Sequence, residues 1–445
     1  MYLRLGVFSV AYTHKTLTYK NRSEQITVEM MDKVARVVYD AGKSNDAEIK
    51  VKRSEIVYKH MRDPALLKYY YRMKTISNIE RDEMVGSSPT DLFVGRFGYP
   101  KVFIGPLLPP EFGDTSLLST PERWKYLSIN QIIEMRSKLV RGMHTTNIHD
   151  VEKGRLEEQV RDLALAENPA EAEVKFEKKP FVKLSLDDHA EPFGPSAVMK
   201  SMDVYNVKAE RKIEKLYFDD DAKASTALIE LYDRNIPVSK LQRALSAGLF
   251  GLKNSRRFVP TRWSITAVDD TLSKNNLVNV KEYEPLDAIR VYYNNALDNR
   301  WLIFFIPGNW QYESIEVWYP HTIWNDENEV TIYSSHEGYG GRKTYAEIGG
   351  CYYAARLAVS EKLKEMQKQA VVLILRETHA GYTLPVGVWN VREHVRQTLQ
   401  TEPDILYNRS QVFDYISKRL AIPPKEWINN SYILRDMLMQ RRLFA

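Results

Sequence analysis

The chain has 445 residues, which is too many for one ordinary hydrophobic core, so two or three domains are expected. Hydrophobic residues make up 44% and charged residues 27%, a balance typical of globular proteins, and no apolar run approaches the roughly eighteen residues of a membrane span. We therefore expect a cytoplasmic protein with no membrane partner. The formal net charge of +5 is compatible with binding nucleic acid but does not require it.

Cysteine usage excludes two further kinds of site. Cys351 is the only cysteine, so the chain forms no intramolecular disulfide and holds no cysteine-based zinc ion. Its neighbours are apolar residues and tyrosines, which predicts a packed and inert thiol.

The N-terminal half contains short predicted elements. Residues 1–12 and 25–30 mix apolar and β-branched residues and predict strands, and a mostly helical stretch follows over 28–74. A short apolar strand is expected at 102–104 and a helix at 129–139.

A change of composition marks residues 151–180, which are dense in Glu, Lys and Ala. This stretch is interpreted as an exposed helix followed by a charged connector. Two helices broken at Pro237 are then expected over 225–248.

The C-terminal third has the clearer pattern. Four β-rich runs, at 286–293, 301–306, 312–319 and 330–333, precede a long predicted helix over 344–369. The wholly apolar run 370–375 predicts a strand in the middle of a sheet, and a helix follows at 391–400. The expected fold is mixed α/β or α+β, with a central mixed sheet covered by helices and a more irregular, helical N-terminal lobe.

An arginine-rich segment, residues 254–266, is the strongest functional signal. Arginine forks bind phosphate in a bidentate manner, and Pro260 predicts an extended loop rather than a basic helix. The predicted DNA-binding residues are this cluster and one arginine of the 391–400 helix: Lys253, Arg256, Arg257, Arg262, Trp263 and Arg392. The alternative is a buried structural loop whose arginines pair with acids such as Asp269 and Asp270.

A glycine-rich turn at 338–344 lies between a predicted strand and a predicted helix. Glycines permit close backbone approach and helix N-termini attract anions, so Gly340, Gly341, Arg342 and Lys343 are predicted to bind phosphate. The alternative is a tight turn with solvated charges.

Carboxylates give only a weak indication of catalysis. Glu377 follows the apolar strand at a place where α/β active sites often lie, and His379 is near it, so Glu377 is the candidate catalytic acid. Glu313 and Glu316 point to opposite faces of one strand and are poor partners for a single metal ion. We predict no metal site and no cofactor, with Mg²⁺ needed only if the protein is an enzyme.

The C-terminal segment is basic, with seven Lys or Arg against three acids from Arg409 onward. Pro423 and Pro424 interrupt the helical pattern, so the residues after Ala421 are expected to move independently. The terminal Gln440, Leu443 and Phe444 are typical of a short peptide that binds a partner protein. Its amide enters a small polar pocket of the partner, and its apolar side chains fill an apolar one. The alternative is a final helix packed on its own domain.

Several blocks together resemble the archaeal Nre family of DNA repair proteins. These blocks are Asp91–Pro100, Ile104–Leu107, Phe193–Ala197, Leu245–Leu249, Phe258–Thr266, Tyr345–Leu357 and Pro385–Arg396. The resemblance implies a role in DNA damage repair and a C-terminus that binds the sliding clamp PCNA, but no known reaction. Many relatives begin with a cysteine-rich, zinc-finger-like segment, which has no counterpart here.

The resemblance also implies a domain division. Residues 1–295 match the Nre N-terminal domain, 296–408 match the C-terminal domain, and 409–445 form the basic tail. The main hypothesis is a repair factor that binds DNA and is recruited to PCNA. The alternatives are a metal-dependent, nuclease-like enzyme and an adaptor that binds only proteins.

Overall fold

The computed structural model describes residues 82–180, 185–187, 189–320, 322, 325 and 329–443. Contacts divide the chain into two compact units, 1–70 and 71–445, and all of the described residues lie in the second unit. The strands predicted at 1–12 and 25–30 and the helical stretch predicted over 28–74 lie outside the described residues.

The first sheet has six strands. Five follow the order β1-β5-β6-β4-β2, and β3 pairs with β4 beside that path. Only the β4–β6 pair is parallel. The strands are β1 (Glu83–Ser88), β2 (Lys101–Ile104), β3 (Leu107–Leu108), β4 (Val140–Asn147), β5 (Ala170–Phe176) and β6 (Ser196–Tyr205).

Residues 151–180 do not form the expected connector. They contain helix α5 (Arg155–Leu165) and strand β5, which lies between β1 and β6. The burial of β5 alternates along the strand, with Ala170, Ala172, Val174 and Phe176 buried. The Glu and Lys residues between them occupy the other face, so a half-buried strand has the composition of a charged linker.

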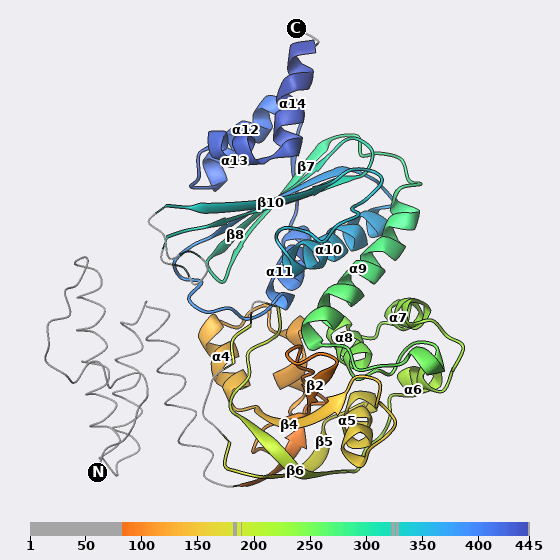
Figure 1. Ribbon diagram of the computed structural model, residues 1–445. Coiled ribbons are helices and arrows are strands. Elements are labelled where there is room, and N and C mark those ends of the chain that lie inside the picture. The colour runs from red at the N-terminus through yellow and green to blue at the C-terminus, as the bar shows by residue number, and fades with distance from the viewer. Residues whose placement is uncertain are drawn as a thin grey trace, which may run out of the picture. The chain divides into compact units, whose positions relative to one another are not determined.

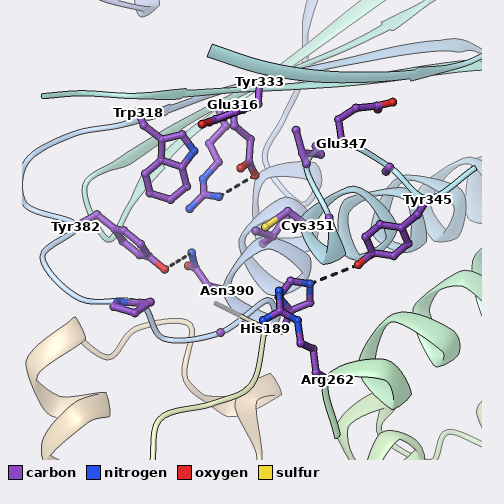
Figure 2. A pocket seen from close by; sticks show the side chains of 17 residues that line it. His189, Arg262, Glu316, Trp318, Tyr333, Tyr345, Glu347, Cys351, Tyr382 and Asn390 are labelled. Carbon is purple, nitrogen blue, oxygen red and sulfur yellow. Dashed lines mark hydrogen bonds and ion pairs between the residues drawn. The ribbon is translucent and has the colours of Figure 1, made fainter. Parts of the chain in front are cut away.

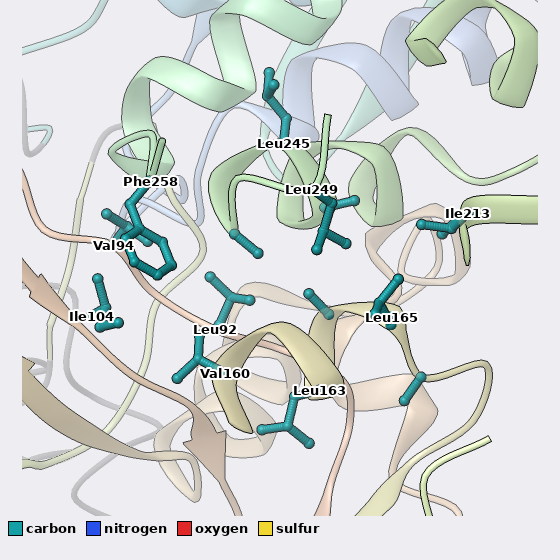
Figure 3. Packing of buried hydrophobic residues seen from close by; sticks show 14 of the residues in the cluster. Leu92, Val94, Ile104, Val160, Leu163, Leu165, Ile213, Leu245, Leu249 and Phe258 are labelled. Carbon is teal, nitrogen blue, oxygen red and sulfur yellow. The ribbon is translucent and has the colours of Figure 1, made fainter. Parts of the chain in front are cut away.

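Helices pack over the first sheet and around its core (Figure 3). Ser128 and Gln131 form a capping box that begins α4, which confirms the predicted helix near 129–139. The two helices predicted on either side of Pro237 are also present. The helices of this half are α4 (Ile129–Ser137), α5, α6 (Arg211–Tyr217), α7 (Ala224–Asp233) and α8 (Val238–Ser246).

The second sheet also has six strands, in the order β10-β9-β11-β8-β7-β12. The apolar run 370–375 belongs to β11, which lies between β9 and β8, as its composition predicted. The β9–β11 pair is the parallel one in this sheet. The strands are β7 (Ile289–Ala296), β8 (Asn299–Ile306), β9 (Gln311–Trp318), β10 (Thr331–Glu337), β11 (Val371–Thr378) and β12 (Asp404–Leu406).

Both faces of the second sheet are covered by helices (Figure 1). One face packs against α9 (Thr261–Val280), α10 (Gly350–Met366) and α11 (Trp389–Leu399). The other packs against α12 (Arg409–Arg419), α13 (Pro424–Asn430) and α14 (Tyr432–Leu443). The predicted mixed α/β fold is confirmed, with its strands divided between two sheets.

Helix α9 corrects the expectation of a loop at 254–266. Pro260 is the cap residue, and the helix begins at Thr261. A proline at the start of a helix loses no hydrogen bond, because the first backbone N–H groups have no partner within the helix. Thr261 exchanges hydrogen bonds with Val94, which ties the start of α9 to the segment before β2.

The segment after Ala421 is docked, in contrast to the independent motion expected from its prolines. Trp427, Leu434 and Met437 are buried against the second sheet. The Glu377 carboxylate accepts hydrogen bonds from the backbone N–H groups of Ala421 (3.1 Å) and Ile422 (2.7 Å). Buried apolar side chains and a buried carboxylate therefore hold this segment in place.

Candidate functional site

The arginine-rich segment divides into buried and exposed side chains. Arg256 is buried and donates to the carbonyl oxygens of Gly251 and Asp219, both at 3.0 Å. Its guanidinium also stacks on Tyr217, so Arg256 stabilises a loop and does not reach DNA. Arg257 is exposed, and Lys253 is exposed and paired with Asp220 at 2.9 Å.

Arg392 is also excluded from a DNA surface. It is fully buried, and its Nη1 donates to both carboxylate oxygens of Asp269, at 3.0 and 3.2 Å. Its Nε donates to Glu393 at 3.1 Å. The prediction that Arg392 binds DNA is therefore wrong, and the alternative, pairing with nearby acids, is what the structure shows.

The glycine-rich turn does not form the predicted phosphate site at a helix N-terminus. Helix α10 begins at Gly350, well after Gly340, Gly341 and Lys343. Arg342 is engaged inside the turn, donating to the carbonyl of His336 at 2.8 Å and to both oxygens of Glu347 at 2.8 and 2.9 Å. The helix-dipole argument therefore does not apply to these residues.

Glu377 is a structural anchor rather than an open acid. It is fully buried, accepts two backbone N–H groups, and lies 3.1 Å from His379 and 3.8 Å from Arg300. Within the described ranges, no group of three His, Cys, Asp or Glu side chains could hold a metal ion. Glu313 and Glu316 lie on opposite faces of β9, as predicted: Glu313 contacts α14, and Glu316 pairs with Arg376.

Arg262 and Trp263 remain as surface residues in the first turn of α9. Trp263 is 45% exposed and packs on Tyr99, with 5.3 Å between ring centroids. Arg262 lies 3.7 Å from Asp187 and lines two adjoining pockets. The pocket beside α9, which we call the outer pocket, has a volume of about 470 Å³ and is lined by Arg262, Trp263, Thr266, Ala267, Asp270, Tyr345 and Tyr353.

The second pocket, which we call the inner pocket, has a volume of about 460 Å³ and shares Arg262 and Tyr345 with the outer one. Figure 2 shows Trp318 and Tyr382 on one side of it and Tyr345 with Glu347 on the other. Strands β9, β10 and β11, the start of α10 and the start of α11 all contribute to its lining.

His189 and the start of α10 form one end of the inner pocket. The backbone N–H of Gly350 donates to His189 Nε2 at 3.2 Å, so this nitrogen acts as an acceptor. Tyr345 Oη lies 3.4 Å from the same nitrogen. Gly349 has φ +64, and a Cβ on Gly350 would approach the His189 ring to 2.8 Å, so this arrangement requires two glycines.

The opposite wall of the inner pocket contains a buried ion pair. Arg376 Nη1 donates to Glu316 at 2.9 Å, and its guanidinium lies over the rings of Trp318 and Tyr382. At the rim, the hydroxyl of Ser335, together with Arg342, lowers the pKa of Glu347 to about 2. Both acids are thus paired with arginines, and the two pockets together are near neutral rather than basic.

Sequence reasoning identified Arg262 and Trp263 but missed His189, Tyr345 and Asn390. The available signal was the set of blocks that resemble the Nre family. The blocks Phe258–Thr266, Tyr345–Leu357 and Pro385–Arg396 are far apart in the sequence, yet each contributes residues to the lining of the inner pocket. Cys351, expected to be packed and inert, is half-buried and also lines this pocket.

The residues predicted to bind the clamp lie at the end of the chain. Gln440 and Leu443 belong to the last turns of α14, where only the backbone is described, and Phe444 lies outside the described residues. Met437 is buried and Met439 is 62% exposed, as expected for positions on opposite faces of a helix that packs on one side.

Comparisons with known proteins agree with the resemblance in the sequence blocks. Residues 57–325 match the family model described as archaeal Nre, N-terminal, and residues 337–445 match archaeal Nre, C-terminal. The chain is 38% identical to DNA repair protein NreB of Archaeoglobus fulgidus, over 80% of this chain and 90% of that protein. It is 37% identical to DNA repair protein NreA of Haloferax volcanii, over 73% and 80%.

A third relative, DNA repair protein NreA of Archaeoglobus fulgidus, is 33% identical over 81% of this chain and 90% of its own length. No solved structure matches the chain. In the part of the chain that the structure describes, every helix is too short or too polar to cross a membrane. The two family models and these relatives cover most of the sequence, and the chain therefore belongs to the archaeal Nre family.

Proposed function

We propose that this protein is a DNA repair factor that binds DNA through base stacking on the surface formed by Tyr99, Trp263, Tyr345 and Arg262. We call this set the stacking surface. The observation that carries the proposal is the exposure of Trp263 and Tyr345 beside Arg262 in the lining of the outer pocket, with the exposed ring of Tyr99 packed on Trp263. Relatives that are 33–38% identical are named DNA repair proteins, which supports the biological role.

Exposed aromatic rings are the main feature of this surface. Tyr99 and Trp263 are each 45% exposed and Tyr345 is 57% exposed. Such rings cost free energy in water unless they are covered, and each base has a flat π-face that stacks on them, contributing about 1–3 kcal/mol per base. Arg262 supplies a guanidinium for a neighbouring phosphate or for further stacking.

The charge of the surface decides between two ways of binding DNA. Five cations (Arg262, Lys274, Arg342, Arg356 and Arg376) and four acids (Asp187, Asp270, Glu316 and Glu347) line the pockets or pair with groups that do. A near-neutral surface does not bind long stretches of phosphate backbone. This favours contacts with unpaired bases over a long electrostatic groove on duplex DNA.

The test is fluorescence anisotropy with labelled single-stranded, gapped and intact duplex DNA. Trp263→Ala is expected to weaken binding to single-stranded and gapped DNA about 10- to 100-fold, in line with the loss of one stacked base. Tyr99→Ala is compared with Tyr407→Ala, since Tyr99 packs on Trp263, whereas Tyr407 is 84% exposed and lies just before α12, outside the stacking surface. Equal losses for these two tyrosine variants would contradict a defined stacking surface.

The salt dependence gives a second readout of the same proposal. Arg262→Ala is expected to lower the slope of log affinity against log salt concentration by about one unit, because one phosphate contact is lost. Arg257→Ala serves as the control, because Arg257 is exposed and lines neither pocket. A slope of the wild type far steeper than two units would favour a basic groove elsewhere.

We also propose that the protein is recruited to the sliding clamp PCNA through Gln440, Leu443 and Phe444. The sequence of these residues, two of which lie in the last turns of α14, supports this. Deleting residues 440–445 is expected to abolish clamp binding in calorimetry while leaving the unfolding midpoint and DNA affinity almost unchanged. Equal clamp affinity of both proteins would remove the recruitment proposal. Clamp binding without any DNA binding would instead identify a protein-only adaptor.

A further inference from the structure

The inner pocket has the size and lining of a small-molecule site. Its volume of about 460 Å³ lies within the range of roughly 300–1,000 Å³ that ligand pockets occupy. Trp318 and Tyr382 supply flat aromatic surfaces, and Arg376 and Glu316 supply a buried donor and acceptor. A planar, polar-edged molecule suits such a lining better than an aliphatic one.

Asn390 gives the most specific indication of a ligand. It is fully buried at the start of α11 and lines the inner pocket, and its Oδ1 has no hydrogen-bond partner. Its Nδ2 donates only weakly, to Tyr382 Oη at 3.5 Å (Figure 2). A buried amide acceptor without a hydrogen bond destabilises the folded protein, so such a group indicates a missing partner.

An amide side chain matches the edge of a nucleobase. It presents one acceptor and a donor group side by side, which is the arrangement that recognises an adenine edge in a bidentate manner. Protein pockets that hold a base outside the helix combine such hydrogen bonds with stacking between aromatic side chains. Asn390 offers the hydrogen-bonding edge, and Trp318 and Tyr382, whose ring centroids lie 6.0 Å apart at 59°, form one aromatic wall on which a base can pack.

The place of the inner pocket relates it to the stacking surface. Arg262 and Tyr345 line both the inner pocket and the outer pocket beside Trp263. A DNA strand stacked on Trp263 would thus have one nucleotide next to the mouth of the inner pocket. Arg262 lies at the shared boundary, where it is placed to bind the phosphate of that nucleotide.

We propose that the inner pocket binds one nucleobase, rotated out of a DNA strand that lies across the stacking surface. This inference rests on the proposed DNA-binding function and adds a class of ligand for one pocket. The same chemistry would accept the base of a free deoxynucleotide, so the experiment separates the two sources.

The experiment uses the full-length protein and DNA that carries 5-iododeoxyuridine at a mismatched position. Irradiation joins this base to an aromatic side chain in contact with it, and mass spectrometry identifies the peptide. The expected attachment is to Trp318 or Tyr382. Asn390→Leu, which keeps nearly the same shape, is expected to reduce this attachment at least tenfold at DNA concentrations that saturate both proteins in anisotropy. Asn294→Leu is the matched control, because Asn294 lies on β7 outside the pocket.

Each outcome decides the proposal. Attachment only to Trp263 or Tyr99, with normal DNA affinity, would overturn the base pocket and leave the stacking surface intact. If the wild type binds no DNA, the proposed function fails, and calorimetry with free deoxynucleoside monophosphates decides the pocket. Saturable binding that Asn390→Leu abolishes would then support a free-nucleotide site. The absence of such binding would overturn the pocket proposal as well.

Discussion

Individual arginines in this protein have opposite roles that depend on their burial. Arg392 is fully buried against Asp269, whereas Arg262 is partly exposed at a pocket mouth. A buried charge requires a partner, because removing one member of the pair leaves the other uncompensated in a medium of low polarity. An exposed pair contributes little, because water and salt screen it.

Substitution of Arg392 is therefore expected to affect stability. Arg392→Met should lower the free energy of unfolding in urea by about 3–5 kcal/mol, because Asp269 is left buried without its counter-ion. The double variant with Asp269→Asn should recover part of this loss. Arg262→Ala is the control and should change stability by less than about 1 kcal/mol. A stable Arg392→Met protein with weakened DNA binding would contradict the structural role.

A second prediction at this scale concerns pH. Burial lowers the pKa of His394 to about 4, from an ordinary value of 6.5. Between these two values the unfolded chain binds a proton that the folded protein does not, so stability falls as the pH is lowered through this interval. The full interval corresponds to about 3 kcal/mol.

The measurement is the free energy of unfolding at several pH values for wild type and His394→Phe. From pH 7 to pH 4 the free energy of unfolding of the wild type should fall by about 3 kcal/mol more than that of the variant, because the variant lacks the titrating group. His149→Phe is the control, because His149 is exposed. Parallel pH profiles for wild type and His394→Phe would contradict the assignment.

At the scale of elements, two buried glutamates hold the C-terminal helices on the second sheet. The Glu313 carboxylate accepts from Ser431 Oγ at 2.6 Å and from the backbone N–H groups of Tyr432 and Ile433 at 2.7 and 2.9 Å. It thus caps the N-terminus of α14 from a distant strand, where a negative charge also suits the helix dipole. Glu377 accepts from the backbone N–H groups of Ala421 and Ile422, which hold the connection between α12 and α13 on the sheet.

Amide hydrogen exchange rates can distinguish the effects of these two glutamates. Glu313→Gln is expected to accelerate exchange at Tyr432 and Ile433 by about 10- to 100-fold, because charge-assisted hydrogen bonds become weaker neutral ones. Glu377→Gln should instead accelerate exchange at Ala421 and Ile422. If each variant affected both segments equally, the two glutamates would not act as separate anchors.

At the scale of the whole described unit, the two family models do not correspond to separate sheets. The N-terminal model ends at residue 325, yet β7, β8 and β9 lie before that point and pair with β11 and β12 after it. Helix α9 adds further links, through Asp269 to Arg392 and through Asp270 to Arg356. The rings of Trp124 and Trp389 meet at 5.0 Å between η2 (Pro121–Arg123) and α11. The predicted division at residue 295 stays a prediction.

This shared sheet predicts that residues 337–445 do not fold alone. Strand β11 would lose both neighbours, β8 and β9, and its apolar side chains would be exposed on a central strand. Circular dichroism of the isolated fragment should show no cooperative thermal transition, in contrast to the full chain. A sharp transition for the fragment would show that the C-terminal family region is an independent domain.

The sequence by itself determined most elements of the C-terminal third. Runs such as 370–375 and 301–306 are apolar throughout or rich in β-branched and aromatic residues. These local patterns predict strands regardless of which strands pair with them. Helix α9 was not predicted, because Pro260 was interpreted as a break when it marks the start of the helix. The ordered blocks also identified the family, since they depend on residue order alone.

Only the tertiary structure decided which charged residues face solvent. Asp269 lies 123 positions before Arg392, and Asp219 lies 37 before Arg256, so no local pattern predicts that these arginines are buried. The inner pocket combines His189, Arg262, Trp318, Tyr345 and Asn390, which come from five separate segments. A side chain's burial and partners are set by the packing of elements distant in the sequence, and this packing forms the pocket and excludes Arg256 and Arg392 from the surface.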